Sequence, residues 1–336
     1  MVNVAINGLG RIGRATLKIL LDSNDFHVVA VNDLVDAENL AYLLRYDTVY
    51  GRYHKTVEAT DGKLTIDGKE YKVLNEKDPA KLPWKDMGID LVFECSGVFT
   101  KREDLEKHLH AGAKRVILSA PAKTEDIRTV VLGVNSDGNK EEQIISCASC
   151  TTNCITPVVE IINRRIGIKK ANMTTVHAYT SSQALVDGPN KKKRRGRAAA
   201  ANFVPTSTGA AKATAKALPE MEGKFDGAAI RGPVPAGSIA DINMVTERET
   251  SVEEINNILR EEAQSERYKG ILGASDDELV SSDIIQDSRA SIVDLNMTQV
   301  VGGDLVKIMS WYDNEWGYAS QMVREAQHVS SKAMAS

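Results

Sequence analysis

The chain is poor in cysteine, has no long apolar run and carries no large excess of charge of either sign. Four cysteines in 336 residues are too few for the disulfide framework of a secreted domain. No apolar stretch approaches the roughly 18 residues that span a bilayer, and the first 20 residues read as a strand and a helix without a signal-peptide pattern. The net charge of −4 argues against a chain that as a whole binds polyanions. We therefore expect a cytoplasmic protein that makes no contact with membranes.

Length and composition indicate a folded protein with two domains. At roughly 150 residues per domain, 336 residues predict two. The content of 42% hydrophobic and 26% charged residues is ordinary for globular proteins and excludes disordered, collagen-like and coiled-coil chains. Up to about residue 150, short apolar strands alternate with helices, which predicts an α/β fold with a mostly parallel sheet covered on both faces. Beyond that point, longer strands with fewer helices predict an α+β second domain.

Several short signals predict where elements begin and turn. Asp67-Gly68 between two alternating apolar stretches predicts a hairpin with a primed turn. A Ser/Thr-x-x-Glu pattern that opens a helix occurs twice, as Thr100 with Glu103 and as Ser251 with Glu254. Residues 178–205 are polar, irregular and too long for an ordinary connection, so we expect a functional loop there.

Three glycines near the N-terminus form the pattern Gly8-x-Gly10-x-x-Gly13 between an apolar strand and a helix, and Asp33 ends the next strand. This context predicts a dinucleotide site. Gly8 permits a tight turn, Gly10 lets a pyrophosphate approach the backbone, and Gly13 lets the helix pack on the strand. Asp33 can accept hydrogen bonds from the ribose hydroxyls and would repel a 2′-phosphate, which favours NAD over NADP. The alternative is a structural glycine turn followed by an unrelated acid.

Cys147, Cys150 and Cys154 lie within eight residues, and three interpretations compete. A zinc site at Cys147-x-x-Cys150 lacks further ligands. A dithiol redox site does not fit, because the pair does not follow the first strand of a small domain. The third interpretation is one nucleophilic thiol, Cys150, where a strand meets a helix, because a helix N-terminus and a nearby imidazole stabilise a thiolate. Cys147 and Cys154 are then small buried thiols.

Pro157 complicates the helix expected after Cys150, because proline lacks an N–H and fits poorly inside a helix. Propensity alone starts this helix at Thr156. Otherwise Pro157 kinks a longer helix, or Cys150 lies in a separate first turn.

His177 is the candidate general base. It closes the apolar strand expected at 173–176 and opens the loop at 178–205, a position where catalytic histidines are common. The other five histidines lie in segments rich in charge, and we expect them on the surface: His27, His54, His108, His110 and His328.

Ser149-Cys150-Thr151-Thr152-Asn153 and Asn7-Gly8-x-Gly10-Arg11-Ile12-Gly13 together resemble the phosphorylating glyceraldehyde-3-phosphate dehydrogenases, of the NAD-dependent bacterial type. Further stretches similar to this family are 175–180, 206–211 and 311–317, so the resemblance covers essentially the whole chain. It implies three parts. These are a Rossmann-type, doubly wound NAD-binding domain at 1–149, a catalytic α+β domain with a largely antiparallel or mixed sheet at 150–313, and a C-terminal helix at 314–336 that packs back on the first domain.

The resemblance also implies an activity in glycolysis. Cys150 would attack the aldehyde of D-glyceraldehyde 3-phosphate, His177 would take the hydroxyl proton, and a hydride would pass to NAD. Inorganic phosphate would then release 1,3-bisphosphoglycerate from the thioester, and the Cys150 N–H with the His177 ring would stabilise the oxyanion. The alternative within this class is an erythrose-4-phosphate dehydrogenase that hydrolyses its thioester.

The resemblance also implies which residues bind NAD and which bind the two phosphates, and it implies no metal. Expected at NAD are Gly8, Gly10, Arg11, Ile12, Gly13, Asp33, Lys77, Ser119 and Asn314. Expected at the substrate phosphate are Thr180 and Arg231, and at the attacking phosphate Ser149, Thr151, Arg195, Thr208 and Gly209. Without the resemblance, Thr208-Gly209 reads equally well as an anion site or as a plain helix cap.

Residues 191–197 hold six cations in seven positions. Without them the chain has 36 basic and 46 acidic residues, so the segment is a local positive island. A solvated loop explains most of its lysines. A nucleic-acid patch is an alternative that we disfavour, because no aromatic residues interleave to stack on bases. In the resembled family this loop approaches a neighbouring subunit's cofactor, which implies a homotetramer.

Overall fold

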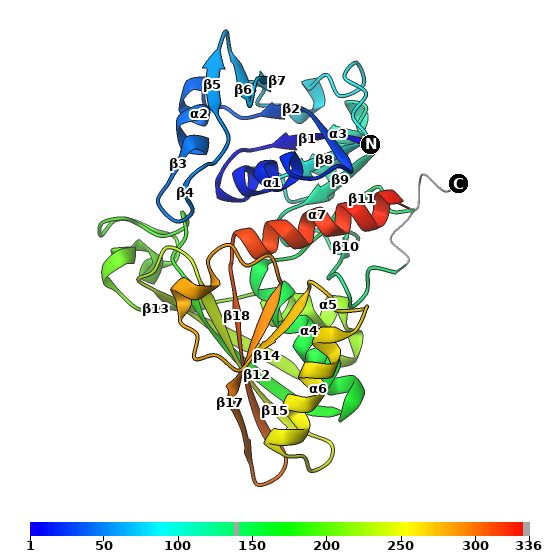
Figure 1. The fold of residues 1–336 in the computed structure, drawn as a ribbon, viewed down its shortest axis with the longest axis vertical. Coiled ribbons are helices and arrows are strands. Elements are labelled where there is room, and N and C mark those ends of the chain that lie inside the picture. Colours follow the sequence, from blue (N-terminus) through cyan, green and yellow to red (C-terminus); the bar gives the residue numbers. More distant parts are fainter. Residues whose placement is uncertain (138–140, 332–336) are drawn as a thin grey trace. The chain divides into compact units, whose positions relative to one another are not determined.

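The computed structural model describes residues 1–137 and 141–331 (Figure 1). Its backbone divides into two compact units by internal contacts. Of the described residues, the first unit comprises 1–130, 136–137, 141–148 and 322–331, and the second comprises 131–135 and 149–321.

The first unit is built on a nine-stranded sheet with the order β10-β11-β9-β8-β1-β2-β7-β6-β5. Six of its strand pairs are parallel, and only β5 and β6 add antiparallel pairs at one edge. The central strands β1, β2 and β8 are mostly apolar and mostly buried, as expected for strands of a parallel sheet that helices cover. The predicted doubly wound Rossmann architecture is therefore confirmed. The strands are β1 (Val2–Asn7), β2 (Phe26–Asn32), β5 (Val57–Thr60), β6 (Lys63–Ile66), β7 (Lys69–Leu74), β8 (Leu91–Glu94), β9 (Arg115–Leu118), β10 (Arg128–Thr129) and β11 (Ile144–Ser146).

Helices connect these strands, and a two-stranded ribbon lies outside the main sheet. The helices are α1 (Arg11–Leu21), α2 (Ala37–Arg45) and α3 (Arg102–His110), and the ribbon is β3 (Tyr46–Asp47) with β4 (Gly51–Arg52). The hairpin predicted at Asp67-Gly68 is confirmed: Ile66 pairs with Lys69 around a two-residue turn. Both turn residues have positive φ, 47° and 77°, as a type I′ turn requires.

The two capping predictions had different outcomes. In α6 (Val252–Gln264), Ser251 accepts a hydrogen bond from the Glu254 N–H at 3.1 Å, as predicted. The prediction for α3 is wrong, because its N-cap is Lys101 rather than Thr100. The Arg102 N–H instead donates to the side chain of Thr124, 22 residues away, so a neighbouring segment supplies the acceptor.

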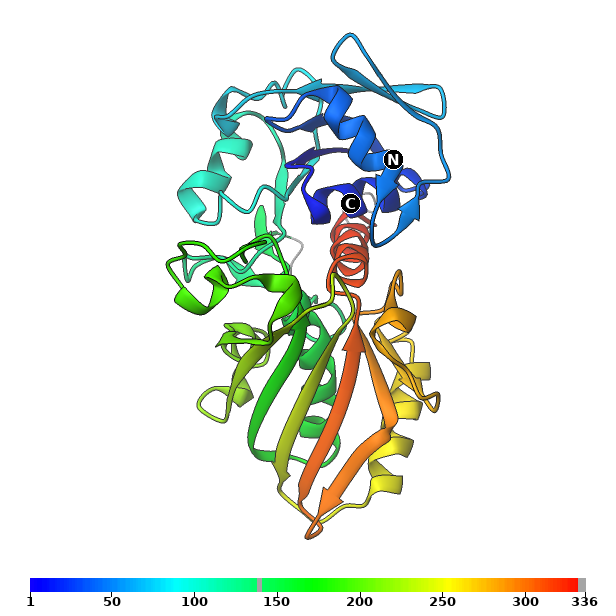
Figure 2. The ribbon, with the colours of Figure 1, turned by 90° about the vertical axis from the view of Figure 1, so that its left-hand side faces the viewer.

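The second unit is an α+β fold, as predicted, with a seven-stranded mixed sheet of order β13-β14-β12-β15-β18-β17-β16. Buried and half-buried residues alternate along β15 and β18, because one face of the sheet is covered (Figure 2). Helices α4, α5 and α6 supply that cover with a shared apolar core. The strands are β12 (Ile168–Ala178), β13 (Val204–Ser207), β14 (Phe225–Gly232), β15 (Ser238–Thr246), β16 (Leu272–Ser275), β17 (Ser291–Val301) and β18 (Leu305–Tyr312). The remaining helices are α4 (Cys150–Arg165), α5 (Ala210–Ala217) and α7 (Trp316–Ser331).

Helix α4 begins at Cys150 and runs through Pro157, so the helix start predicted at Thr156 is wrong. Ser149 caps the helix by accepting from the Thr152 N–H at 3.1 Å. An internal proline costs about 3 kcal/mol. Burial of each large aliphatic side chain returns about 1.5–3 kcal/mol, and α4 buries several, including Ile155 and Val158. Tertiary packing therefore outweighs the propensity that the sequence expresses locally.

The loop predicted at 178–205 is present as two short 3-10 turns between β12 and β13. Two backbone hydrogen bonds join distant parts of this loop: the Ala184 N–H donates to the Arg195 carbonyl oxygen, and the Gly188 N–H donates to the Gly196 carbonyl oxygen. Among residues 1–137 and 141–331, no helix is long and apolar enough to cross a membrane.

Candidate active site

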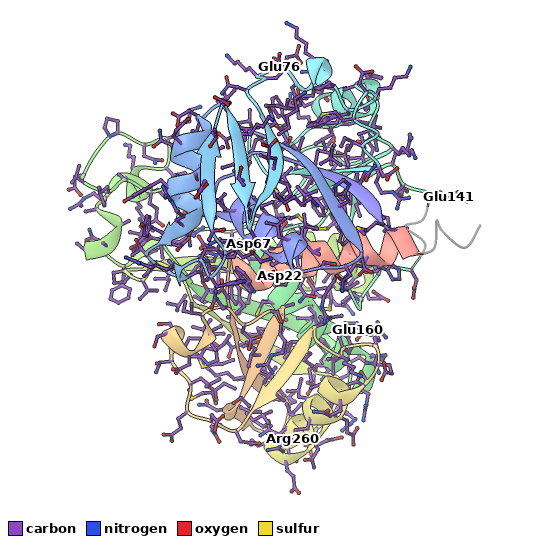
Figure 3. The ribbon with its side chains drawn as sticks, turned by 45° about the horizontal axis from the view of Figure 1, so that its top comes forward. Asp22, Asp67, Glu76, Glu141, Glu160 and Arg260 are labelled. Atoms are coloured by element: carbon purple, nitrogen blue, oxygen red, sulfur yellow. The ribbon has the colours of Figure 1, made fainter. Side chains whose placement is uncertain are left out.

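A cleft of about 470 Å³ opens in the first unit at the carboxyl ends of β1, β2 and β8. This is the edge at which parallel sheets bind ligands. The cleft brings together four of the residues predicted to bind NAD: Gly8, Gly10, Asp33 and Lys77. Its other lining residues are Asn7, Asn32, Leu34, Glu76, Cys95, Ser96, Val98 and Phe99. Glu76 lies on the segment that follows β7 (Figure 3).

The geometry of the three glycines fits the roles that their spacing suggests. Gly8 has a φ of +92°, and a Cβ there would lie 2.6 Å from the Ser96 backbone. A Cβ on Gly13 would collide with the carbonyl oxygen of Gly8, so the helix can approach the loop only with glycine at this position. Gly10 faces open space, and it is the N-cap of α1 with no side-chain cap. The N-terminus of α1 thus carries no side-chain cap, and a helix N-terminus attracts anions.

Asp33 is held in a fixed orientation at the end of β2. Its Oδ2 accepts from the Leu9 N–H at 2.6 Å, and its Oδ1 accepts from the Val35 N–H at 3.0 Å. Apolar side chains flank it: Leu34 is 60% exposed and Val98 69% exposed, although both line the cleft.

Of the remaining residues predicted at NAD, Arg11 is engaged by Asp47, a partner that sequence reasoning missed. Their salt bridge is 2.5 Å long, and the guanidinium lies 5.3 Å from the centre of the Tyr50 ring. Burial alone would raise the pKa of Asp47, but hydrogen bonds from Arg11 and the Tyr50 N–H outweigh it and hold that pKa below its ordinary value.

Four other residues predicted at NAD lie outside the residues that line this cleft: Ile12, Gly13, Ser119 and Asn314. Asn314 belongs to the second unit, where its Oδ1 accepts from the Ser238 hydroxyl at 2.9 Å.

The second unit contains the pair of residues predicted to be catalytic. Cys150 is the first residue of α4, and His177 lies one residue before the end of β12. Their side chains meet, with 3.4 Å between Sγ and Nε2. The thiol is half-buried, whereas the imidazole is 5% exposed. A thiol at a helix N-terminus beside an imidazole is the arrangement of an activated nucleophile.

The contacts of Nδ1 bear on the tautomer of His177. Two groups approach Nδ1: the Ala178 carbonyl oxygen at 2.7 Å, which accepts a proton from it, and Arg231 Nη1 at 2.9 Å, which would donate to it. The carbonyl contact is the shorter, so we place the ring proton on Nδ1. Arg231 donates to the same carbonyl oxygen from 2.9 Å. Nε2 therefore faces the Cys150 thiol as an acceptor, which is the protonation state a general base needs.

Burial and charge shift both groups of this pair. Burial raises the pKa of Cys150, opposed by the charge of Arg231 and by N–H groups at the start of α4. Burial and the charge of Arg231 lower the pKa of His177 to about 3. Each group on its own thus favours its neutral form, and proton transfer from Sγ to Nε2 creates two charges that stabilise each other at contact distance.

Tyr312 contacts the His177 ring and the residue that follows Cys150, and the sequence analysis did not identify it. Its buried hydroxyl lies 2.9 Å from the Thr151 hydroxyl and 2.8 Å from the Thr175 hydroxyl. Its ring meets the His177 ring edge-on, with 5.9 Å between centres. Tyr312 therefore joins the start of α4 to β12. Thr151, predicted at the attacking phosphate, uses its hydroxyl in this contact.

Two cations predicted to bind phosphate lie near His177. Arg231 is 2.9 Å from Nδ1, and its buried Nε has no hydrogen-bond partner among the described residues. Arg195 is close enough to lower the pKa of His177, after burial and Arg231. Its Nη1 lies 3.3 Å from the Ser182 hydroxyl, which in turn lies 2.9 Å from that of Thr180. These contacts connect Thr180 to Arg195 through Ser182.

The other residues predicted at the attacking phosphate serve as helix starts. Ser149 caps α4, and Gly209 is the N-cap of α5. The Thr208 hydroxyl accepts from the Ala210 N–H at 3.2 Å, but the N-cap position itself is Gly209, which provides no side-chain cap.

Comparison with known proteins places both units in one family. The NAD binding domain of glyceraldehyde 3-phosphate dehydrogenase matches residues 2–102, and the C-terminal domain of the same family matches residues 149–314. The chain belongs to the glyceraldehyde 3-phosphate dehydrogenase family. It is an NAD-dependent oxidoreductase, and the Rossmann unit with the glycine loop is the family's NAD-binding domain.

Curated members of the glyceraldehyde 3-phosphate dehydrogenase family are similar over nearly the whole length. The glyceraldehyde-3-phosphate dehydrogenase of Thermotoga maritima is 53% identical over 326 residues, covering 96% of this chain and 97% of the relative. That of Streptomyces coelicolor is 49% identical over 325 residues and 96% of both chains. That of Geobacillus stearothermophilus is 49% identical over 335 residues and 99% of both chains.

In this family member, the two cysteines that flank Cys150 in the chain are more deeply buried than Cys150. Cys147 and Cys154 are buried, as predicted, and burial raises the pKa of Cys154 to about 12. All four cysteines are free thiols. Within residues 1–137 and 141–331, no three His, Cys, Asp or Glu side chains lie together where they could hold a metal ion.

The expectation that the other five histidines are exposed is wrong for His108. Its side chain is completely buried, because it falls on the inner face of α3 one turn after Leu105. The charged residues around it occupy the outer face of that helix. His54 and His110 are exposed, and His27 and His328 are half-buried.

Proposed function

We propose that the protein oxidises D-glyceraldehyde 3-phosphate and phosphorylates it to 1,3-bisphosphoglycerate, as a step of glycolysis. The observation that carries this proposal is the 3.4 Å contact between Cys150 Sγ and His177 Nε2, with Nδ1 held by Ala178. Relatives named glyceraldehyde-3-phosphate dehydrogenase, at about half identity over nearly the full length, support the substrate.

Cys150 and His177 divide the chemical work. Nε2 takes the thiol proton, and Sγ attacks the aldehyde carbon to form a thiohemiacetal. The Cys150 N–H and the protonated imidazole donate to the oxygen that becomes negative. His177 then takes the hydroxyl proton as the carbon is oxidised to a thioester, with bound NAD as the hydride acceptor. Attack by inorganic phosphate on the thioester carbon breaks the C–S bond, releases the acyl phosphate and returns the thiol.

Two anions must bind for this reaction. We assign the substrate phosphate to Arg231 and Thr180, because the unpartnered Nε of Arg231 offers a donor beside the reacting pair. The attacking phosphate is assigned to Arg195 with the helix starts at 149–151 and 208–209.

NAD fits the cleft of the first unit by its chemistry. The open space at Gly10 admits a pyrophosphate, the fixed carboxylate of Asp33 accepts from ribose hydroxyls, and the apolar side chains beside it suit a purine ring. We assign NAD contacts to Gly8, Gly10, Arg11, Ile12, Gly13, Asp33, Lys77 and Ser119, and the nicotinamide carboxamide to Asn314.

The wider organisation follows the same assignment. We propose an NAD-binding domain at 1–149, a catalytic domain at 150–313 and a C-terminal helix at 314–336 that packs on the former. The grouping of residues 322–331 with the first unit supports the last point. A homotetramer in the cytoplasm is the corresponding proposal for the assembly.

The test is the dependence of NADH formation on each reactant. We expect NADH only when triose phosphate, NAD and inorganic phosphate are all present. Rapid turnover of erythrose 4-phosphate without phosphate would instead support the dehydrogenase that hydrolyses its thioester. Absence of NADH with either sugar phosphate would refute both.

A further inference from the structure

Three polar residues lie in register at the ends of adjacent parallel strands beneath the cleft. Asn7 of β1 pairs across the sheet with Asn32 of β2 on one side and with Glu94 of β8 on the other. All three are buried, and Glu94 is 0% exposed. Asn7 and Asn32 also line the cleft, whereas Glu94 lies behind it.

The buried carboxylate of Glu94 accepts four hydrogen bonds. Oε2 accepts from Asn7 Nδ2 at 2.6 Å and lies 3.1 Å from His108 Nε2. Oε1 accepts from the Ser96 N–H at 2.8 Å and from the Ser96 hydroxyl at 2.5 Å. A buried carboxylate without partners costs several kcal/mol, so a full set of donors is what makes this position tenable.

His108 donates to Glu94 as a neutral ring. Its Nδ1 receives the indole N–H of Trp84 at 3.0 Å, so Nε2 carries the ring proton and points it at Oε2. Trp84 and His108 are both completely buried. The pair therefore fixes the carboxylate from the side away from the cleft.

From Glu94 the contacts branch to the three segments that line the cleft. Through Ser96 they reach the glycine loop, because Gly8 packs directly on the Ser96 backbone. Through Asn7 they reach Asn32, whose Nδ2 is 2.7 Å from Asn7 Oδ1. Asn32 in turn binds both the N–H and the C=O of Glu76, at 2.9 Å each, one residue before Lys77.

We propose that Glu94, fixed by His108, is a positioning residue of the NAD site: its carboxylate holds the glycine loop, the 76–77 segment and the 96–99 segment in the arrangement that receives the dinucleotide. This inference rests on the proposed placement of NAD in the cleft. Because the side chain lies beneath the cleft, its loss weakens NAD binding without touching the thiol chemistry in the second unit.

Four variants test the proposal through the NAD dissociation constant, measured by titration without triose phosphate. Glu94→Gln keeps the shape but turns an amide NH₂ toward two donors, Asn7 Nδ2 and His108 Nε2. His108→Gln keeps a donor near Oε2, whereas His108→Phe removes it, and both lose the acceptor for Trp84. Val57→Ala in β5, at the far edge of the same sheet, is the control for general destabilisation.

We expect Glu94→Gln and His108→Phe to raise the NAD dissociation constant about tenfold, the effect of losing one hydrogen bond to a charged group. His108→Gln and Val57→Ala should stay within about twofold of the wild type. The kcat at saturating NAD should change by less than about twofold in all four.

Equal affinity of Glu94→Gln and wild type for NAD would overturn the proposal. If Glu94→Gln does not fold, equal affinities of His108→Gln and His108→Phe would overturn it in the same way. A fall in affinity for Val57→Ala as large as for Glu94→Gln would also do so. Wild-type protein that binds NAD but forms no NADH would refute the proposed reaction and leave this comparison intact.

Discussion

Arg231 places its guanidinium 2.9 Å from Nδ1 of His177, the ring nitrogen that does not face Cys150. Because Nδ1 already donates to Ala178, the cation repels a second proton on the ring and keeps Nε2 free. The same charge lowers the pKa of the Cys150 thiol against the effect of burial. One arginine thus acts on both members of the reacting pair, in the direction that each role requires.

Replacement of the nucleophile is the most direct test. Cys150→Ser should lower kcat by at least about a thousandfold, because a serine hydroxyl is a far weaker nucleophile beside the same imidazole. NAD affinity should remain near the wild-type value. The control is Cys154→Ser, whose buried side chain contacts Ser291 and Ser310 and should leave turnover nearly unchanged. Near-normal turnover in Cys150→Ser would show that another group attacks the aldehyde.

Loss of the base should move the reactivity of the thiol. In His177→Asn the thiolate loses the imidazolium that stabilises it, so the pKa of Cys150 rises. The rate of alkylation by iodoacetamide should therefore shift to higher pH than in the wild type, and kcat should fall by about 10²- to 10⁴-fold. Alkylation profiles that coincide in the two proteins would separate His177 from thiol activation.

Arg231 should affect substrate binding as well as the thiol. Arg231→Gln should raise the KM for triose phosphate by about tenfold to a hundredfold, since a charge-assisted contact to phosphate is lost. Arg231→Lys should recover only part of this, because lysine lacks the planar fork. Initial-rate kinetics at saturating NAD provide the measurement. A KM unchanged in both variants would assign the substrate phosphate elsewhere.

Asp33 should control the choice of coenzyme. Asp33→Asn should weaken NAD binding by about tenfold and reduce the preference for NAD over NADP, because the carboxylate that binds the ribose hydroxyls and repels a 2′-phosphate is gone. The ratio of kcat/KM for the two coenzymes at equal concentration measures this. An unaltered ratio would remove Asp33 from coenzyme selection.

Tyr312 should contribute mainly to stability. Tyr312→Phe removes the hydroxyl that joins Thr151 to Thr175 and leaves buried polar groups with fewer partners. We expect the free energy of unfolding to fall by about 1–3 kcal/mol, measured by chemical denaturation. Turnover should fall less than in His177→Asn, because the ring edge still meets the imidazole. A loss of activity without a loss of stability would point to a chemical role instead.

Patterns confined to a few neighbouring residues predicted much of the architecture. Alternation of short apolar strands and helices predicted the parallel sheet of the first unit, and Asp67-Gly68 predicted its hairpin, because both depend on local backbone preference. Cys150 and His177 were nominated by their positions at element ends. Their 3.4 Å contact is a product of the fold, since 27 residues separate them in the chain.

The reactive and binding groups could be identified from the sequence alone. They are a glycine loop followed by an acidic residue, one thiol at the start of a helix and one histidine at the end of a strand. Only the tertiary structure decided that α4 continues through Pro157, that Thr124 displaces Thr100 at the start of α3, and that His108 lies buried against Glu94. The physical reason is the same in each case. Burial and hydrogen bonds between distant segments contribute energies as large as the local preferences, and they override them.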